Sequence, residues 1–353
     1  MVELDNLHYD LREIDGYNKP FNIVISAREP GKTVALWFKK IFKIWLKDNR
    51  PWIYLTRTAA EITEGMIETI REANINKFLP DEENVTFCYN RGTFKQGIVD
   101  IFISGKIFVR IVSLSLPLRR IKLAVLRNAR GMAMDEYIID PRSGEKYIQN
   151  EGFKIFEAFT TWRRECDGMF KAYFLANPYT LYNPLFVTLG VDTSKLKKGE
   201  FYVGSIFVIH WATLNPLLRE KILKENPLYS FDEDYSGYAL DGTPVNDRNI
   251  PLGEQPEGFF LRYVFRYEEK FIGAFRNPDV DGKPEYHCRE VERISAERVA
   301  WCFDLKEIVK RTELITSAAK ISLSHFKASM ARGRVTFSEI PIYYIMTEVF
   351  KQI

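Results

Sequence analysis

The stretch Phe21–Phe38, FNIVISAREPGKTVALWF, decides how this chain is expected to fold. It opens with a short apolar run, Phe21–Ile25, which predicts a buried β-strand. The eight residues from Ser26 to Thr33 match the phosphate-loop pattern G-x-x-x-x-G-K-[ST] except at the first position, where serine replaces glycine. An apolar, helix-like run, Val34–Ile44, follows. This order of strand, loop and helix is the context that the phosphate-loop pattern requires.

The residue types in the loop suit a phosphate group. A loop that enters a helix N-terminus directs several backbone N–H groups at one point, and the helix dipole favours an anion there. Gly31 lets the backbone approach a phosphate, Lys32 is expected to bridge the β- and γ-phosphates, and the Thr33 hydroxyl to ligate Mg²⁺. The expected nucleotide-binding residues are Ser26, Ala27, Arg28, Glu29, Pro30, Gly31, Lys32 and Thr33. The alternative is a chance match in an ordinary strand–loop–helix unit.

Length and composition indicate more than one domain. The chain has 353 residues, 46% of them hydrophobic, which is enough for two or more cores. A net charge of +3 means that any affinity for nucleic acid comes from local basic patches. The four cysteines form no C-x-x-C pair, which disfavours a zinc site and fits reduced thiols in a cytosolic protein. The acidic N-terminus predicts no signal peptide, and the most apolar run, Phe201–Ala212, is too short to span a bilayer.

Hydrophobic patterns predict an α/β domain in the first part of the chain. Strands are expected at Trp52–Leu55, Val85–Tyr89, Ile98–Ile103, Ile107–Leu114, Met169–Ala176 and Phe201–His210, and helices at Thr58–Ala73, Glu151–Arg164 and Asn215–Lys224. Thr58 and Glu61 have the spacing of a capping box. In the helix 151–164 the apolar positions are Phe153, Phe156, Phe159 and Trp162, whose three-residue spacing is near helical.

The remainder predicts a linker and a smaller α+β domain. The Pro-, Gly-, Asp- and Asn-rich residues 226–258 indicate a linker or small subdomain. Beyond it we expect a hairpin of Phe259–Tyr267 and Lys270–Phe275, strands Glu285–Cys288 and Val335–Phe337, a helix start at Ser295–Arg298, and helices Leu314–Ala331 and Glu339–Lys351. The expected domains are therefore 1–212, 213–256 and 257–353.

A second motif, Ala133-Met134-Asp135-Glu136, predicts the other half of a nucleotide site. P-loop ATPases place a short apolar run that ends in Asp-Glu on the strand beside the phosphate loop. Asp135 is expected to hold the hydration shell of Mg²⁺, and Glu136 to orient and polarise the attacking water. Asn177 follows a predicted strand at the edge where open α/β sheets bind ligands, so it is expected to sense the γ-phosphate or position water. The alternative for Asn177 is a turn-forming residue before Pro178.

A basic segment precedes the Asp-Glu motif. Residues 101–134 contain no Asp or Glu but seven cations: Lys106, Arg110, Arg119, Arg120, Lys122, Arg127 and Arg130. This pattern favours a polyanion as partner, most of all at the dense and turn-like cluster Pro117–Lys122. The alternative is a solvated face whose cations pair with acids from elsewhere in the fold. A weaker basic face is expected within residues 314–338.

With these motifs in hand, the chain resembles the genome-packaging ATPases of φ29-like tailed phages. The similar places occur in the same order, namely Phe21–Thr33 with its internal Ala-Arg, Met134–Ile138, Thr161–Arg164, Phe174–Asn177 followed by Asn183–Phe186, and Ala331–Phe337. The resemblance implies a RecA-like ASCE P-loop ATPase domain, a small linker domain and an RNase H-like C-terminal domain that binds nucleic acid. It also implies ATP and Mg²⁺ as cofactors.

The resemblance also implies partners and a place of action. Such ATPases form rings, as pentamers, at the portal (connector) vertex of an empty procapsid and pump double-stranded DNA inward. Packaging RNA bridges ATPase and capsid in some members. This implies a homo-oligomer in the host cytoplasm that works transiently at the portal vertex, is not in the mature virion and involves no membrane.

By the same resemblance, Arg163 is the arginine finger that acts in the neighbouring subunit's site, with Arg164 as the second choice. Arg119, Arg120 and Lys122 are expected to line the DNA channel on a loop and to contact phosphates. Two departures from the family pattern are Ser26, and Ala59 where a cation is expected near the end of the second strand; the latter leaves Arg57 as the only basic candidate there.

Two other functions remain as alternatives. A large terminase would also cut DNA, but a two-metal nuclease needs a cluster of carboxylates, and the strand 259–267 contains no acid; Glu268 and Glu269 fall at the turn. We therefore expect a vestigial nuclease fold without nuclease activity. A non-hydrolysing nucleotide-binding scaffold has no use for a water-activating carboxylate such as Glu136.

Overall fold

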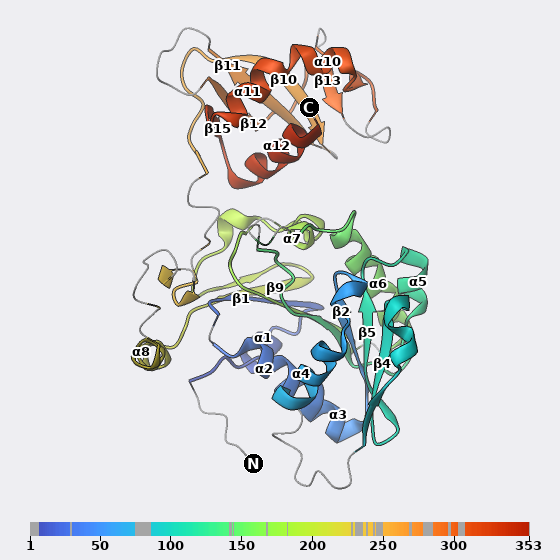
Figure 1. Ribbon diagram of the computed structural model, residues 1–353. Coiled ribbons are helices and arrows are strands. Elements are labelled where there is room, and N and C mark those ends of the chain that lie inside the picture. Colours follow the sequence, from blue (N-terminus) through green and yellow to red (C-terminus); the bar gives the residue numbers. More distant parts are fainter. Residues whose placement is uncertain are drawn as a thin grey trace. The chain divides into compact units, whose positions relative to one another are not determined.

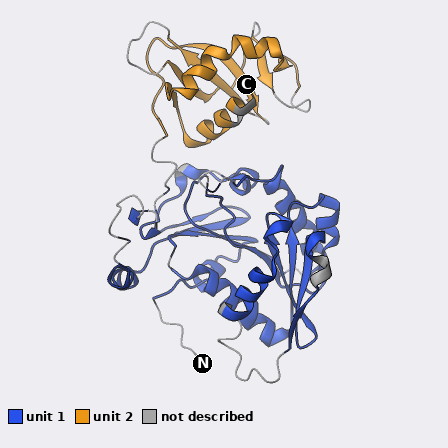
Figure 2. Cartoon of the chain, viewed as in Figure 1, with its two compact units in different colours: residues 1–245 blue, residues 246–353 orange. Residues whose placement is uncertain are grey.

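The structure, a computed structural model, divides the chain into two compact units, residues 1–245 and 246–353 (Figure 2). It describes residues 7–28, 30–74, 86–140, 143, 145–166, 169–181, 183–226, 229, 236–237, 239–242, 244, 250–267, 270–277, 285–295, 298–302 and 308–352.

A nine-stranded sheet in the order β3-β4-β5-β2-β6-β7-β1-β9-β8 forms the centre of unit 1 (Figure 1). Its strands are β1 (Phe21–Ser26), β2 (Trp52–Thr56), β3 (Phe87–Tyr89), β4 (Ile98–Ile103), β5 (Lys106–Ser113), β6 (Gly131–Met134), β7 (Lys171–Ala176), β8 (Phe201–Val203) and β9 (Phe207–Ala212). The pairs from β5 to β9 in this order are parallel, whereas β4 and β8 pair antiparallel at the two sides. All carboxyl ends of the central strands therefore meet at one edge of the sheet.

Helices cover both faces of this sheet (Figure 1). They are α1 (Arg12–Gly16), α2 (Lys32–Val34), α3 (Lys43–Asp48), α4 (Glu64–Asn74), α5 (Leu118–Leu123), α6 (Glu151–Glu165), α7 (Pro184–Leu189) and α8 (Pro216–Glu225). One buried core contains Leu36, Phe42 and Ile67, and the other contains Trp162 and Phe186. Because both faces are covered, strands such as β1 and β2 are apolar and buried along their whole length.

Three of the predicted elements differ from the structure. The helix expected at Val34–Ile44 extends from Lys32 to Asp48, and its middle part, Ala35–Phe42, is π-helical. The capping box of Thr58 and Glu61 is present, but it closes a 3₁₀ turn, and the regular helix α4 begins only at Glu64. The strand expected at 201–210 is an antiparallel hairpin, β8 and β9.

The helix predicted at Glu151–Arg164 is confirmed as α6, but its apolar positions do not all lie on one face. Trp162 and Phe159 are buried, whereas Phe153 is 50% exposed. A step of three residues turns an α-helix by about 300°, so successive residues of such a series drift around the helix. Over the three steps from Trp162 back to Phe153 this drift amounts to about half a turn, which carries Phe153 to the solvent side.

The described residues between β9 and residue 245 belong to unit 1. Leu218 and Ile222 of α8 pack into the same core as Leu240, and Trp211 donates its indole N–H to the carbonyl oxygen of Gly242 at 3.2 Å. Residues 213–245 are therefore assigned to unit 1. The sequence had instead predicted a separate linker subdomain at residues 213–256.

Unit 2 contains a six-stranded sheet in the order β14-β13-β10-β11-β12-β15. Its elements are β10 (Phe260–Tyr267), β11 (Lys270–Arg276), β12 (Tyr286–Glu290), β13 (Ala300–Cys302), β14 (Thr312–Leu314), β15 (Val335–Phe337), α10 (Ser317–Ser322), α11 (Ser324–Ala331) and α12 (Ile340–Gln352). Strands β10, β11 and β12 pair antiparallel, and β13 and β14 continue the sheet in parallel from β10. β15 joins the sheet in parallel beside β12.

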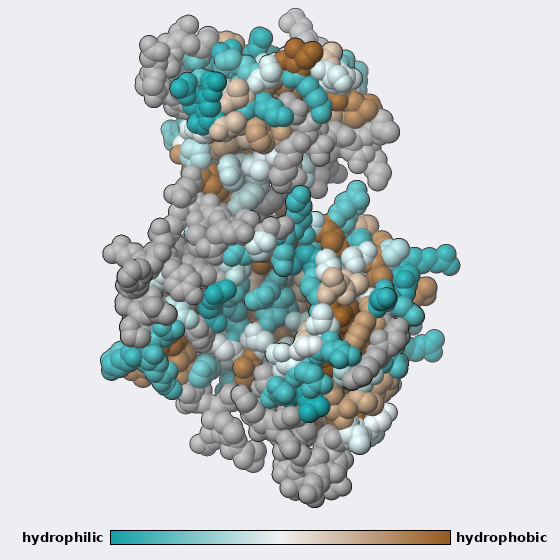
Figure 3. All heavy atoms as spheres, in the orientation of Figure 1, coloured by the Kyte–Doolittle hydropathy of each residue, from teal (hydrophilic) through white to brown (hydrophobic). Residues whose placement is uncertain are grey.

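The predicted hairpin of unit 2 is confirmed as β10 and β11. The single helix expected at Leu314–Ala331 is instead the end of β14 followed by two short helices, and the helix start expected at Ser295–Arg298 includes residues outside the described part of the chain. No helix among the described residues is long and apolar enough to cross a bilayer. On the face shown in Figure 3, hydrophobic residues occur in small groups between hydrophilic ones.

Candidate nucleotide and DNA sites

The phosphate loop leaves β1 at the carboxyl edge of the sheet and enters α2. Gly31 has a φ of 77°, a conformation that glycine adopts without steric cost. A Cβ on Gly31 would also approach Cδ2 of His8 to 3.0 Å. Ser26, where the pattern has glycine, is fully buried, and its hydroxyl donates to the carbonyl oxygen of Ala27 at 3.1 Å. Serine therefore fits this position with its polar atom satisfied. Glu29 lies outside the described residues.

Lys32 is buried and its ammonium group lies inside the loop. It donates to the carbonyl oxygens of Ser26 at 3.0 Å and Ala27 at 2.7 Å, and to Oδ1 of Asn177 at 3.0 Å. Burial lowers the pKa of Lys32 to about 8, against the attraction of the neighbouring carboxylates. The side chain is therefore mostly charged at pH 7 and suited to an anionic ligand.

Thr33 and Asp135 join the two sequence motifs, which are 102 positions apart. The Thr33 hydroxyl donates to Oδ2 of Asp135 at 2.6 Å. Burial raises the pKa of Asp135, while the hydrogen bond from Thr33 and the charge of Lys32 oppose the shift. Mg²⁺ prefers oxygen ligands and usually takes one or two carboxylates together with waters and substrate phosphates. The hydroxyl and carboxylate oxygens of this pair fit that requirement.

The strand order corrects one expectation about the Asp-Glu motif. β6, which leads to Asp135, does not lie beside β1, because β7 pairs with both strands and separates them. Asn177 follows β7 directly and therefore lies between the phosphate loop and the Asp-Glu motif. This placement explains its hydrogen bond to Lys32 and brings the buried Asn177 into the site.

Glu136 is exposed and has an unusual backbone conformation. Its φ of 52° lies in the left-handed region, which costs a non-glycine residue roughly 1–2 kcal/mol. Its N–H donates to Oδ1 of Asp135 at 2.9 Å. Partial desolvation of the carboxyl group by the surrounding site, and then the charge of Asp135, raise the pKa of Glu136. A raised pKa brings a carboxylate closer to the range in which it accepts a proton from water.

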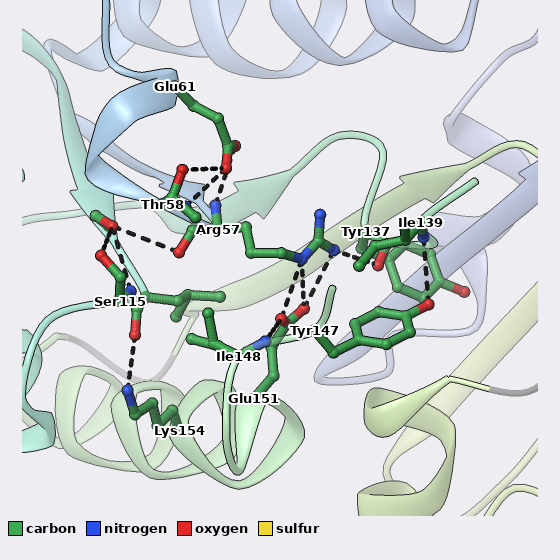
Figure 4. A network of polar contacts seen from close by, with 12 residues as sticks. Arg57, Thr58, Glu61, Ser115, Tyr137, Ile139, Tyr147, Ile148, Glu151 and Lys154 are labelled. Carbon is green, nitrogen blue, oxygen red and sulfur yellow. Dashed lines mark hydrogen bonds and ion pairs between the residues drawn. The ribbon is translucent and has the colours of Figure 1, made fainter. Parts of the chain in front are cut away.

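A buried ion pair holds the segment after Glu136 (Figure 4). The Nε atom of Arg57 lies 3.0 Å from Oε2 of Glu151, and Nη2 of Arg57 donates to the carbonyl oxygen of Tyr137 at 2.7 Å. The Glu151 carboxylate also accepts from the N–H of Ile148 at 3.1 Å. Arg57, the only basic candidate near the end of β2, is thus buried within its own subunit and is not free to reach a neighbour.

The nucleotide-site residues line a cavity of about 620 Å³, within the range of sites that hold small ligands. Its lining consists of His8, Tyr9, Arg28, Gly31, Lys32, Thr33, Val34, Ala35, Lys39, Asp135, Glu136 and Asn177. Five of these residues were not among the predicted site residues, namely His8, Tyr9, Val34, Ala35 and Lys39. The N–H of Tyr9 donates to the carbonyl oxygen of Pro30 at 2.8 Å, and its hydroxyl bonds to Nδ1 of His210 at 2.8 Å. A local sequence pattern cannot predict the contact between Tyr9 and His210, because the two residues are 201 positions apart.

Arg163 lies away from the nucleotide cavity of its own subunit. It is exposed near the end of α6, with its guanidinium 5.8 Å from the ring centre of Phe159. It lines a second cavity, of about 520 Å³, together with Arg130, which precedes β6, and Lys171, which begins β7. These residues mark the amino ends of the parallel strands, opposite the phosphate loop. Arg163 therefore does not line the cavity that contains the phosphate loop, and Arg164 is exposed beside it.

The basic cluster forms the short helix α5, where a loop was expected. Arg119 and Arg120 are exposed, and Nη2 of Arg120 donates to the carbonyl oxygen of Gln96 at 3.3 Å. Lys122 is half-buried and forms an ion pair with Glu157 of α6. Outside the cluster, Arg110 pairs with Asp100 of β4. Some cations of the acid-free segment thus have acidic partners from elsewhere in the fold.

Two solved structures are similar to the chain over nearly its whole length. A protein of the bacteriophage Phi-29 viral genome packaging motor assembly is 18% identical with a TM-score of 0.69, covering 98% of this chain and 99% of that chain. A protein of the Phi-28 DNA packaging motor is 16% identical with a TM-score of 0.61, covering 95% of each chain. Protein-family models and curated protein sequences give no match. The similarity establishes the fold that the chain shares with these two proteins, with a largely parallel sheet in unit 1 and a second, mixed sheet in unit 2.

Proposed function

We propose that this protein is an ATP-driven motor that moves viral double-stranded DNA into a preformed procapsid during virion assembly. The observation that carries the proposal is the hydrogen bond of 2.6 Å between Thr33 and Asp135, with Glu136 next to it at the same cavity. It brings together the groups for phosphate binding, metal binding and water activation that a P-loop ATPase needs. The fold shared with two phage packaging motors supports DNA as the cargo.

In this mechanism the chain's own residues have separate tasks. The loop amides and Lys32 bind the phosphates of ATP. Thr33 and Asp135 would hold Mg²⁺, which would supply positive charge where negative charge develops on the phosphates. Glu136 accepts the proton of the attacking water, and Asn177 stands where it can respond to the γ-phosphate.

The motor acts as a ring of identical subunits, a pentamer in the family that the sequence resembles, at the portal of the procapsid. Arg163 of one subunit completes the site of the next, and packaging RNA is a further partner of some such motors. Unit 2 serves as a nucleic-acid-binding module without nuclease activity, because β10, FLRYVFRY, contains no acid.

The test of this function is phosphate release in the presence of Mg²⁺, measured with and without double-stranded DNA. We expect a basal ATPase that rises when duplex DNA is added, while the DNA itself stays intact on a gel. Cleavage of the DNA would favour the terminase alternative. Tight ATP binding with no phosphate release under either condition would favour a nucleotide-binding scaffold.

The DNA contact is tested by replacing three residues of α5 with alanine, Arg119, Arg120 and Lys122. Because a motor handles any sequence, these cations contact phosphates, and their loss weakens DNA binding equally on all sequences. Each lost contact reduces the slope of log affinity against log salt by about one unit. DNA-stimulated and basal ATPase are measured in parallel with the melting temperature.

A loss in the DNA-stimulated part of the activity supports DNA contact at α5. If stimulation and salt slope stay at the parent values, or if only the melting temperature falls, these cations serve folding alone. The triple variant Lys195→Ala, Lys221→Ala and Lys224→Ala is a matched control, because it removes three exposed lysines that lie outside α5 and outside unit 2.

A further inference from the structure

Helix α6 is anchored at its first residue to the catalytic segment. Glu151 binds Arg57, and Arg57 in turn holds the carbonyl oxygen of Tyr137, the residue after Glu136. The N–H of Tyr137 donates to the carbonyl oxygen of Leu175 at 3.2 Å, so the residue that follows the strained Glu136 is fixed from both sides. A displacement of the start of α6 would therefore also displace the backbone next to Glu136.

One turn later, α6 holds the loop that leads into α5. The ammonium group of Lys154 donates to the carbonyl oxygens of Leu114 at 2.9 Å and Leu116 at 3.2 Å. Figure 4 shows Lys154 reaching from α6 to this loop, close to Ser115. These carbonyl groups lie between the end of β5 and the first residue of α5. Hydrogen bonds from a charged donor are stronger than those between neutral groups, so Lys154 ties the loop firmly to α6.

Further along, α6 binds α5 itself. Glu157 forms the ion pair with Lys122, and the indole N–H of Trp162 donates to the carbonyl oxygen of Lys122 at 3.2 Å. The side chains of Lys122 and Glu157 are 33% and 30% exposed, so a phosphate group can reach the ammonium group from solvent. Lys122 therefore has two alternative anionic partners, the carboxylate of Glu157 and a DNA phosphate.

We propose that α6 couples DNA contact at α5 to the position of Glu136, with Lys154 as a positioning residue between them. In this scheme a DNA phosphate replaces Glu157 as the partner of Lys122. Without this ion pair, α6 shifts relative to the loop before α5 and to the Glu136 segment. Coupling between two sites requires an element with two discrete arrangements that both sites influence. The two partners of Lys122 provide these arrangements. The inference rests on the proposed function, since it presumes that DNA binds at α5.

The first test replaces Lys154 by methionine, which keeps the length of the side chain and removes its charge. We expect the ratio of DNA-stimulated to basal ATPase to fall by about 2- to 30-fold, the range found when contacts along a coupling route are removed. Lys224→Met, which removes an exposed lysine of an ion pair on α8, is the matched control and should leave the ratio unchanged. A Lys154→Met variant that is less stable to heat but is stimulated like the parent would show a merely structural role.

The second test replaces Glu157 by glutamine and measures affinity for duplex DNA. Removal of the competing carboxylate should strengthen binding by up to about fivefold, because half-exposed ion pairs are weak. The gain should disappear in a Lys122→Met background, since no competition for Lys122 then remains. Glu220→Gln on α8 is the control for the general loss of a negative charge. An equal gain with and without Lys122 would contradict competition at this residue.

A third measurement separates the inference from the proposed function. Amide hydrogen exchange of residues 136–140 and 145–148 should change when DNA binds the parent protein and should not change in Lys154→Met. If these amides do not respond to DNA in the parent, the coupling is refuted whatever the ATPase activity. A parent protein that releases no phosphate would instead refute the proposed function, and the exchange result would still decide the coupling.

Discussion

Replacement of Glu136 by glutamine is expected to remove ATP hydrolysis while ATP binding stays near the parent value. Glutamine preserves the size of the side chain but cannot accept a proton, and general-base catalysis contributes about 10²- to 10⁴-fold to such reactions. The rate of phosphate release should fall by this factor. Because Glu136 contributes little to binding phosphates, the dissociation constant measured with a fluorescent ATP analogue should change little.

Lys32→Ala is the contrasting variant, because it removes the charge that clamps the phosphates. It should lose both nucleotide affinity and turnover. Glu220→Gln, a change at an exposed carboxylate of α8, serves as the control and should hydrolyse ATP like the parent. If Glu136→Gln turns over ATP at the parent rate, the assignment of the Asp135-Glu136 pair is wrong.

Replacement of Arg163 by alanine is expected to give the other large effect, visible only when subunits are assembled. An arginine supplied by a neighbour can increase the rate of phosphoryl transfer by ~10³- to 10⁵-fold. Arg163 lines a cavity at the edge of the sheet opposite the phosphate loop, so its own site is out of its reach. Rings of Arg163→Ala subunits should therefore bind ATP normally and hydrolyse it very slowly.

Mixing distinguishes an action in the neighbour from an action within one subunit. Arg163→Ala and Lys32→Ala subunits are each inactive alone, but a mixed ring contains interfaces where an intact phosphate loop meets an intact arginine. Phosphate release should therefore recover in part at intermediate ratios. If mixed rings assemble but phosphate release does not recover at any ratio, Arg163 does not act in the neighbouring site. If Arg164→Ala subunits are inactive alone and phosphate release recovers when they are mixed with Lys32→Ala subunits, the role belongs to Arg164.

Elements whose signals lie in neighbouring residues were predictable from the sequence. The strand–loop–helix unit around Gly31, the capping box of Thr58 and the hairpin of β10 and β11 are all present. Each depends on interactions within a few residues of chain, such as a left-handed glycine or a cap that accepts a nearby N–H. Two separate motifs also predicted Thr33 and Asp135 as residues of one Mg²⁺ site, and in the structure their side chains form a hydrogen bond.

Only the tertiary structure decided which distant groups meet. The insertion of β7 between β1 and β6 places Asn177 against Lys32, and the pairing of strands has no counterpart in the spacing of motifs. The tertiary fold also decided the partner of Arg57, because Glu151 lies 94 positions away along the chain.

The electrostatic state of the basic segment was likewise a tertiary property. The absence of acids from residues 101–134 suggested free cations, yet Glu157 neutralises Lys122 from a neighbouring helix. A charge interacts with whatever lies within a few ångströms in space, at any separation along the chain. The sequence alone therefore identified residues whose chemistry suits phosphate groups, while packing across the sheet determined which of them are paired, buried or exposed.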